Sequence, residues 1–135
     1  GNMVAAMDVP KEKTASYGII TPGVVDGALT EVKGLIEKPL PDDAPSTLAV
    51  VGRYILEPGV FDELEKMERG TGGEIQITDS LARRIGHVPF FSHQFSGTRF
   101  DCGSKLGFLQ ANISYALSRD DLADRLEPWL KSLNQ

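Results

Sequence analysis

Residues 48–56 read Leu48-Ala49-Val50-Val51-Gly52-Arg53-Tyr54-Ile55-Leu56, a nearly continuous apolar run. A run of this length, rich in β-branched residues, predicts a buried strand and is the best candidate for a central one. Three earlier segments, 3–9, 17–20 and 29–38, also show strand patterns. The proline-rich segment 39–46 predicts a surface loop before the central strand.

Helical patterns begin only after this group of strands. Apolar residues at helical spacing predict a helix from Pro58 and a second from about Thr78. Later segments predict a strand over 89–95, a short strand over 100–102, a helix capped by Ser104 and a last helix over 122–133. Because strands and helices are mixed, we expect an α/β fold with a mixed sheet. Several strands lack helical cover, which fits half a sheet better than a whole one.

Composition predicts a soluble protein with a single domain over residues 1–135. Hydrophobic residues make up 41% and charged residues 24%, and the net charge of −5 argues against a nucleic-acid partner. No apolar run reaches the length of a membrane span, so we expect no membrane partner. The single cysteine, Cys102, excludes an internal disulfide and fits a cytoplasmic location.

Glu37-Lys38-Pro39 is the first candidate for a functional site. Pro39 restricts Lys38 to extended geometry, so the strand should end here with both charges projecting from its tip. Ligands of open α/β sheets bind at strand ends. A carboxylate beside an ammonium suits a ligand with hydroxyls and a phosphate, such as a sugar phosphate. The alternative is a solvated pair of surface charges.

The glycine-rich segment 70–79 is the second candidate. Glycines allow close approach of the backbone, and Glu74 and Gln76 share one side if the chain is extended. Thr78 is expected to cap the following helix. The alternative is a flexible connection between two helices. No Gly-Lys-Ser/Thr follows, so this segment is not a P-loop.

Asp101 is the third candidate. It follows Phe100 and precedes Cys102 and Gly103, at the start of a predicted helix. A carboxylate in this position can supply a hard oxygen ligand to Mg²⁺, with phosphates completing the shell. The alternative is that Asp101 caps the helix.

Taken in order, five motifs resemble the bacterial UTP–glucose-1-phosphate uridylyltransferases, also called UDP-glucose pyrophosphorylases. They are Tyr17-Gly18, Glu37-Lys38-Pro39, Val51-Gly52-Arg53-Tyr54, Gly72-Gly73-Glu74-Ile75-Gln76-Ile77-Thr78-Asp79 and Phe100-Asp101-Cys102-Gly103. The resemblance implies a Rossmann-like α/β/α sandwich with a mixed sheet. It also implies transfer of uridylyl from UTP to glucose 1-phosphate with Mg²⁺.

The resemblance assigns roles by position. Lys38 and Asp101 would be catalytic, Lys38 holding the sugar phosphate and Asp101 binding Mg²⁺. The substrate-binding residues would be Gly18, Glu37, Lys38, Val51, Gly52, Glu74 and Gln76. Glu37 would accept hydrogen bonds from sugar hydroxyls.

The family's Gly-x-Gly-Thr-Arg nucleotide loop does not occur in the chain. We therefore expect the chain to be the second, C-terminal half of such an enzyme, without the nucleotide-binding portion and inactive alone. The alternatives are a thymidylyltransferase or other glucose-1-phosphate nucleotidyltransferase fragment, and a non-catalytic sugar-phosphate-binding or interaction domain. An exposed sheet edge would pair with other strands, so we expect a homo-oligomer.

Overall fold

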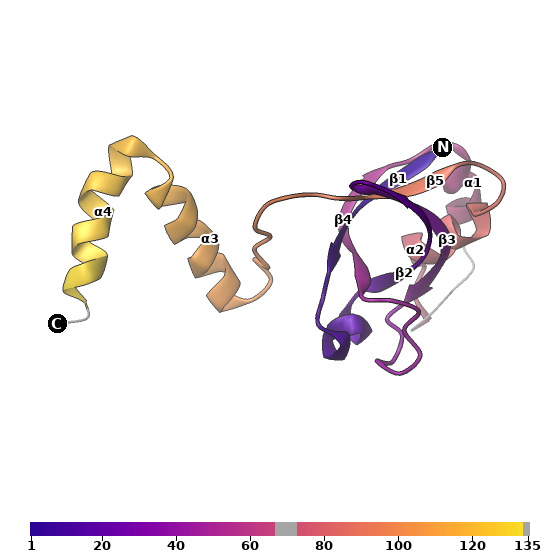
Figure 1. Cartoon of the computed structure of the whole chain (residues 1–135), viewed down its shortest axis with the longest axis horizontal. Helices are drawn as coiled ribbons and strands as arrows, with labels where there is room; N and C mark the ends of the chain where they lie inside the picture. The colour runs from indigo at the N-terminus through magenta and orange to yellow at the C-terminus, as the bar shows by residue number, and fades with distance from the viewer. Residues whose placement is uncertain (67–72, 134–135) are drawn as a thin grey trace. The chain divides into compact units, whose positions relative to one another are not determined.

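Residues 1–66 and 73–133 are described by a computed structural model of the chain. They form two compact units, Gly1–Ser96 and Gly97–Gln135, where the sequence predicted a single domain. The first unit contains the strands and two helices, and the second contains a pair of helices (Figure 1). None of the helices in the described part of the chain is long and apolar enough to cross a bilayer.

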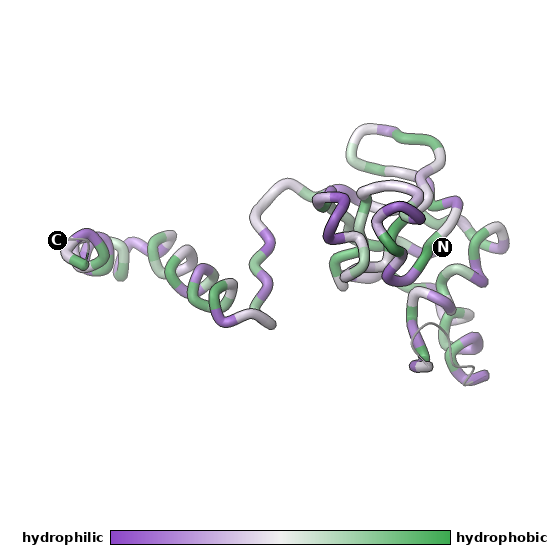
Figure 2. The backbone as a smooth tube through the Cα atoms, turned by 90° about the horizontal axis from the view of Figure 1, so that it is seen from below, coloured by the Kyte–Doolittle hydropathy of each residue, from purple (hydrophilic) through white to green (hydrophobic). Residues whose placement is uncertain are grey.

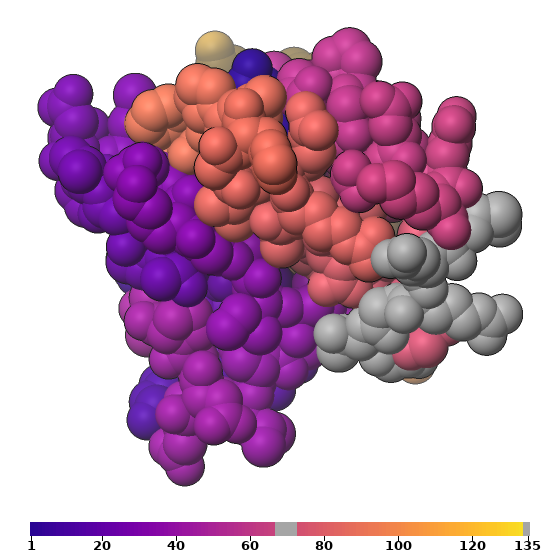
Figure 3. Space-filling model, turned by 90° about the vertical axis from the view of Figure 1, so that its right-hand side faces the viewer, coloured from indigo at the N-terminus to yellow at the C-terminus, as the bar shows by residue number. Residues whose placement is uncertain are grey.

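The strands of the first unit form one mixed sheet. They are β1 (Asn2–Asp8), β2 (Gly18–Asp26), β3 (Leu29–Glu37), β4 (Leu48–Ile55) and β5 (Phe90–Gln94). β1 and β5 run parallel, and the other pairs are antiparallel. Figure 3 shows β5 and the segment before it, in orange, next to the β2–β3 hairpin, in purple. The predicted α/β class and mixed sheet are confirmed for the described residues.

The strand order β1-β4-β2-β3-β5 closes on itself, because β5 pairs with both β3 and β1. The open sheet edge on which the prediction of a homo-oligomer rested is therefore not found among the described strands. The shortest seam lies between β2 and β4, whose register holds the single pair Ile19 and Ala49.

The core of the first unit fills the inside of this closed sheet. Alternate residues of β1 are buried, as the two-residue period of a strand requires. α1 (Gly59–Glu65) and α2 (Ile77–Arg84) add Val60 and Leu81, both fully buried. The main cluster consists of Val4, Ala6, Ile20, Val32, Leu35, Leu48, Val50, Val60, Leu81 and Phe90.

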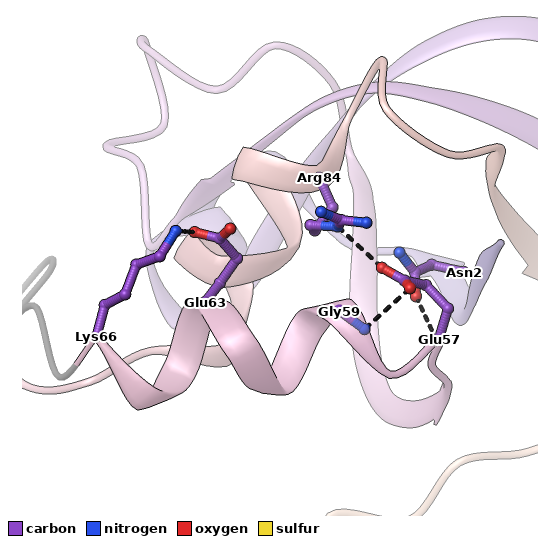
Figure 4. Close-up of polar contacts among 6 residues, drawn as sticks. All are labelled: Asn2, Glu57, Gly59, Glu63, Lys66 and Arg84. Carbon is purple, nitrogen blue, oxygen red and sulfur yellow. Dashed lines mark hydrogen bonds and ion pairs between the residues drawn. The ribbon is translucent and has the colours of Figure 1, made fainter.

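Glu57 joins the start of α1 to the end of α2 (Figure 4). Its Oε2 accepts a hydrogen bond from Gly59 N, and its Oε1 accepts one from Arg84 Nε, both at 2.9 Å. The Glu57 backbone N–H donates to Asn2 Oδ1 at 2.9 Å. The Gly59 N–H bond is the main cause that lowers the pKa of Glu57, and Arg84 adds to it. Glu57 therefore links the start of α1 to the end of α2 through its carboxylate, and it contacts β1 through its backbone N–H.

The second unit consists of α3 (Lys105–Leu117) and α4 (Asp120–Ser132), which pack against each other. Hydrophobic and hydrophilic positions alternate along both helices (Figure 2). The predicted N-cap of α3 is confirmed, because Ser104 Oγ accepts a hydrogen bond from Gly107 N at 3.0 Å.

Three segments have a local structure that their residues alone do not indicate. The turn-forming residues Thr21-Pro22-Gly23 lie inside β2, where the register to β3 shifts on both sides of Pro22. Proline has no N–H for the ladder, so the chain makes an irregularity instead of a turn. The segment 10–16 contains the 3₁₀ helix η1 (Lys11–Ser16). Residues 100–102 form a loop and not a short strand.

Candidate functional site

A cleft of about 180 Å³ lies beside the short β2–β4 seam. Its walls come from four segments that are far apart in the sequence: the start of β2, the end of β3, β4 and the start of α2. The lining residues that matter chemically are Tyr17, Gly18, Glu37, Tyr54, Gln76 and Thr78. The structure thus brings Gly18, Glu37 and Gln76, three of the sequence-predicted site residues, to one place.

Glu37 is the charged centre of this cleft. Its side chain is only 10% exposed, and its Oε2 accepts a hydrogen bond from Thr78 Oγ1 at 2.7 Å. Its Oε1 lies 3.7 Å from Lys38 Nζ. One carboxylate oxygen is therefore held by the protein, and the other is shared with a cation at the rim.

Lys38 departs from the extended geometry predicted for it. Its φ is +48°, in the left-handed region, and its N–H donates to Tyr17 O at 2.9 Å. A non-glycine residue in this region costs on the order of 1 kcal/mol. In a regular strand, neighbouring side chains point to opposite faces. The left-handed turn breaks that alternation, so the ammonium of Lys38 comes back toward the carboxylate of Glu37.

Gly18 leaves the space that this arrangement needs. A Cβ atom at position 18 would lie 2.8 Å from Thr78 Cγ2 and 3.2 Å from Glu37 Oε2. Both distances are shorter than ordinary contacts of a methyl group. Glycine at this position therefore allows Thr78 and Glu37 to meet above the start of β2.

Tyr54 and Thr78 are the two cleft residues whose role the sequence analysis missed. Tyr54 belongs to the apolar run 48–56, yet it lines the cleft, and its pKa is raised by burial and then by the negative charge of Glu37. Its hydroxyl, like that of any ordinary tyrosine, is protonated at neutral pH and can donate a hydrogen bond. Thr78 was interpreted as a helix cap, but its hydroxyl is turned to Glu37, and α2 has no side-chain cap.

The remaining sequence-predicted substrate residues lie near this cleft or outside its wall. Val50 lines the cleft, whereas Val51 is the next residue of the strand and half-buried. Gly52 is exposed with a φ of +76°. Glu74 is exposed and accepts a hydrogen bond from Gln76 Nε2 at 3.1 Å. Residues 70–72 of the glycine-rich motif lie outside the described residues.

Asp101 belongs to the second unit, in the loop before α3. Its Oδ1 accepts a hydrogen bond from Gly103 N at 3.1 Å, and its backbone O accepts one from Ser104 Oγ at 3.0 Å. Among the described residues, no three His, Cys, Asp or Glu side chains gather as a metal-binding group. A single exposed carboxylate fits Mg²⁺ as one oxygen ligand in a shell completed by other groups.

Comparison with known proteins identifies the relatives of the chain. The family model described as "Nucleotidyl transferase" matches residues 1–117. The UTP–glucose-1-phosphate uridylyltransferase of Komagataeibacter xylinus is 57% identical over 106 residues, which cover 78% of this chain and 37% of that protein.

Two solved structures are also similar. A UDP-glucose pyrophosphorylase complexed with UDP-glucose gives a TM-score of 0.80 at 40% identity, over 87% of this chain and 45% of that chain. A UTP-bound enzyme from Acinetobacter baumannii gives a TM-score of 0.83 at 31% identity, over 98% of this chain and 46% of that chain. The chain spans less than half the length of these relatives.

The comparisons contradict the prediction that the chain is the C-terminal half of such an enzyme. They support the uridylyltransferase relationship, but they assign the match to the N-terminal part of the relatives, over about 46% of their length. The prediction rested on the absence of a Gly-x-Gly-Thr-Arg sequence. A missing motif was weak evidence, because it carries no positive information on which part of a longer protein a segment represents.

Proposed function

The chain belongs to the nucleotidyl transferase family, and from this premise we propose that the protein to which it contributes is a UTP–glucose-1-phosphate uridylyltransferase. In the proposed reaction a phosphate oxygen of glucose 1-phosphate attacks the α-phosphorus of UTP. The bond between that phosphorus and the bridging oxygen breaks, and pyrophosphate leaves with the electron pair. The products are UDP-glucose and pyrophosphate.

The observation that carries the proposal is the pairing of Glu37 Oε1 with Lys38 Nζ, 3.7 Å apart at one strand tip. A sugar phosphate has hydroxyl donors and an anionic phosphate, so it complements an acceptor beside a cation. We assign the hydroxyls to Glu37 and the phosphate to Lys38, which acts as a compact point charge. Tyr54 also lines the cleft, and we assign to its hydroxyl the role of a further donor.

These residues can support the transfer without a covalent intermediate. Two polyanions must be held in line, so positioning and charge neutralisation account for most of the catalysis. Lys38 neutralises charge on the sugar phosphate. Mg²⁺, when bound, would neutralise phosphate charge further, and we propose that Asp101 is one of its ligands.

The other sequence-predicted residues have supporting roles in this proposal. Gly18 shapes the floor of the cleft, and Gln76 forms part of its wall, with Glu74 hydrogen-bonded to Gln76 outside that wall. Val51 and Gly52 would border the sugar from β4. The bound UDP-glucose and UTP of the similar structures support the choice of nucleotide and sugar. Because the chain covers less than half of these relatives, we expect the 135 residues alone to be inactive.

The proposal is tested by assaying the complete protein for UDP-glucose and pyrophosphate formation, with dTTP in place of UTP as the comparison. We expect turnover with UTP and glucose 1-phosphate that exceeds turnover with dTTP. A protein that prefers dTTP would be a thymidylyltransferase, and one with no turnover on either nucleotide would refute the proposed activity.

A further inference from the structure

We propose that Thr78 is a positioning residue that sets the affinity of the cleft for its sugar phosphate by holding the carboxylate of Glu37. The inference rests on the proposed function, since it concerns the sugar-phosphate side of the same site. It assigns to Thr78 a task in ligand recognition that a helix cap would not have.

The first step of the argument is the geometry of the Thr78–Glu37 contact. Thr78 Oγ1 donates to Glu37 Oε2 at 2.7 Å, a short distance that is typical of a hydrogen bond to a charged oxygen. Thr78 is 5% exposed, and the side chain of Glu37 is 10% exposed. A hydrogen bond shielded from water in this way fixes the plane of the carboxylate.

The second step is that the two carboxylate oxygens of Glu37 have different partners. Oε2 is engaged by Thr78, while Oε1 lies 3.7 Å from Lys38 Nζ. The oxygen offered to a sugar hydroxyl is therefore Oε1, beside the cation that would hold the phosphate. Without the hydroxyl of Thr78, the carboxylate can rotate and present either oxygen, so the distance between the hydroxyl and phosphate subsites is no longer fixed.

The third step is that Gly18, which has no Cβ, leaves the space that the side chain of Thr78 occupies. The methyl group of Thr78 is the nearest neighbour of the position that a Cβ at Gly18 would take, at 2.8 Å. Threonine thus contacts the floor of the cleft through its methyl group and Glu37 through its hydroxyl. Arg84, at the other end of α2, is fixed by Glu57, so the helix that carries Thr78 is held at both ends.

The experiment uses the complete protein with steady-state kinetics for both substrates. Thr78→Val keeps the shape and removes the hydroxyl, whereas Thr78→Ser keeps the hydroxyl and removes the methyl group. We expect Thr78→Val to raise the KM for glucose 1-phosphate about tenfold, with the KM for UTP changed less than about twofold. Thr78→Ser should restore the KM for glucose 1-phosphate to within about threefold of the wild type.

Two controls separate this role from a structural one. Ser80→Ala removes a buried hydroxyl from the same helix and should leave both KM values unchanged. In a Glu37→Gln background, Thr78→Val should raise the KM for glucose 1-phosphate by less than about a further twofold, because Thr78 acts through the carboxylate. If Thr78→Val does not fold, Thr78→Ala removes the same hydroxyl without added volume and takes its place.

The outcomes distinguish the inference from the proposed function. A wild-type protein without uridylyl transfer would refute the function on which the inference rests. An active wild type would refute the inference alone in any of three cases. These are an unchanged KM for glucose 1-phosphate in Thr78→Val, an equal loss for both substrates, and an equal loss in the valine and serine variants.

Discussion

Replacing Gly18 with alanine perturbs the floor of the cleft by one methyl group. The new Cβ would lie 2.8 Å from Thr78 Cγ2 and 3.2 Å from Glu37 Oε2. Both neighbours are constrained, because they are hydrogen-bonded to each other and Thr78 is 5% exposed. The methyl group can be accommodated only if α2 moves away from β2 or the Glu37 carboxylate swings out.

The expected cost follows from two opposing terms. Overpacking a site of this kind costs about 1–3 kcal/mol. Alanine also restricts the unfolded chain, which stabilises the folded state by about 0.4–1 kcal/mol relative to glycine. We therefore expect Gly18→Ala to lower the free energy of unfolding by about 1–2 kcal/mol. For a unit of this size, that corresponds to a fall in Tm of about 5–10 °C.

Gly23→Ala is the matched control on the same strand. A Cβ at position 23 would also come close to its neighbours, 2.7 Å from Glu31 Oε2 and 2.9 Å from Lys33 Cγ. These neighbours are the side chains of Glu31 and Lys33, 31% and 57% exposed, which can move outward at lower cost than the buried Thr78. We expect Gly23→Ala to change the free energy of unfolding by less than about 0.5 kcal/mol.

Urea unfolding measures both variants, followed through amide NMR signals of residues 1–96 because Trp129 reports on the other unit. An alanine at position 18 that is as stable as the wild type and leaves the Thr78–Glu37 hydrogen bond in place would refute this reasoning. An equal loss in Gly23→Ala would show that crowding along β2 is not specific to the cleft.

Three further predictions concern charge. Lys38→Met should raise the KM for glucose 1-phosphate about 10- to 100-fold in the complete protein, whereas Lys33→Met, which removes an exposed lysine of the same hairpin, should not; equal effects would remove Lys38 from the site. The hydrogen bond from Gly59 lowers the pKa of Glu57 below its ordinary 4.5, so this carboxylate stabilises the fold above about pH 4.5 and loses that effect as the pH falls further. Urea titrations should therefore show Glu57→Gln less stable than the wild type at neutral pH, with a difference that shrinks in acid; a constant difference would contradict the ionic explanation. Asp101→Asn should lower Mg²⁺-dependent turnover at least tenfold and raise the Mg²⁺ concentration required for half-maximal rate, and an unchanged Mg²⁺ titration would exclude Asp101 as a ligand.

Local sequence patterns were sufficient for most of the individual elements. The strand at 48–56 was visible from its apolar β-branched run, and the cap of α3 from Ser104 before a helical stretch. Both signals are contained in a few neighbouring residues. The closure of the sheet depends instead on β5 pairing with β1, 88 positions away in the sequence, as in the pair Asn2 and Phe90. No local pattern encodes that pairing.

The candidate site shows the same division. Glu37 and Lys38 were selected because a proline marked the end of their strand, yet the left-handed turn at Lys38 was not foreseen, since the residue before proline normally prefers extended geometry. Thr78 looked like a helix cap because its neighbours in sequence start a helix. Its actual partner, Glu37, is 41 positions away. Contacts of this separation are set by the packing of α2 on β3.

The central claim is that Glu37 and Lys38 together hold one sugar phosphate, and a crystal structure of the complete protein with glucose 1-phosphate tests it most directly. We predict a sugar hydroxyl within hydrogen-bonding distance of Glu37 Oε1 and the phosphate on Lys38 Nζ, with Thr78 still bonded to Glu37 Oε2. Glucose 1-phosphate bound away from the β2–β4 cleft, with Glu37 and Lys38 contacting only each other or water, would contradict the claim.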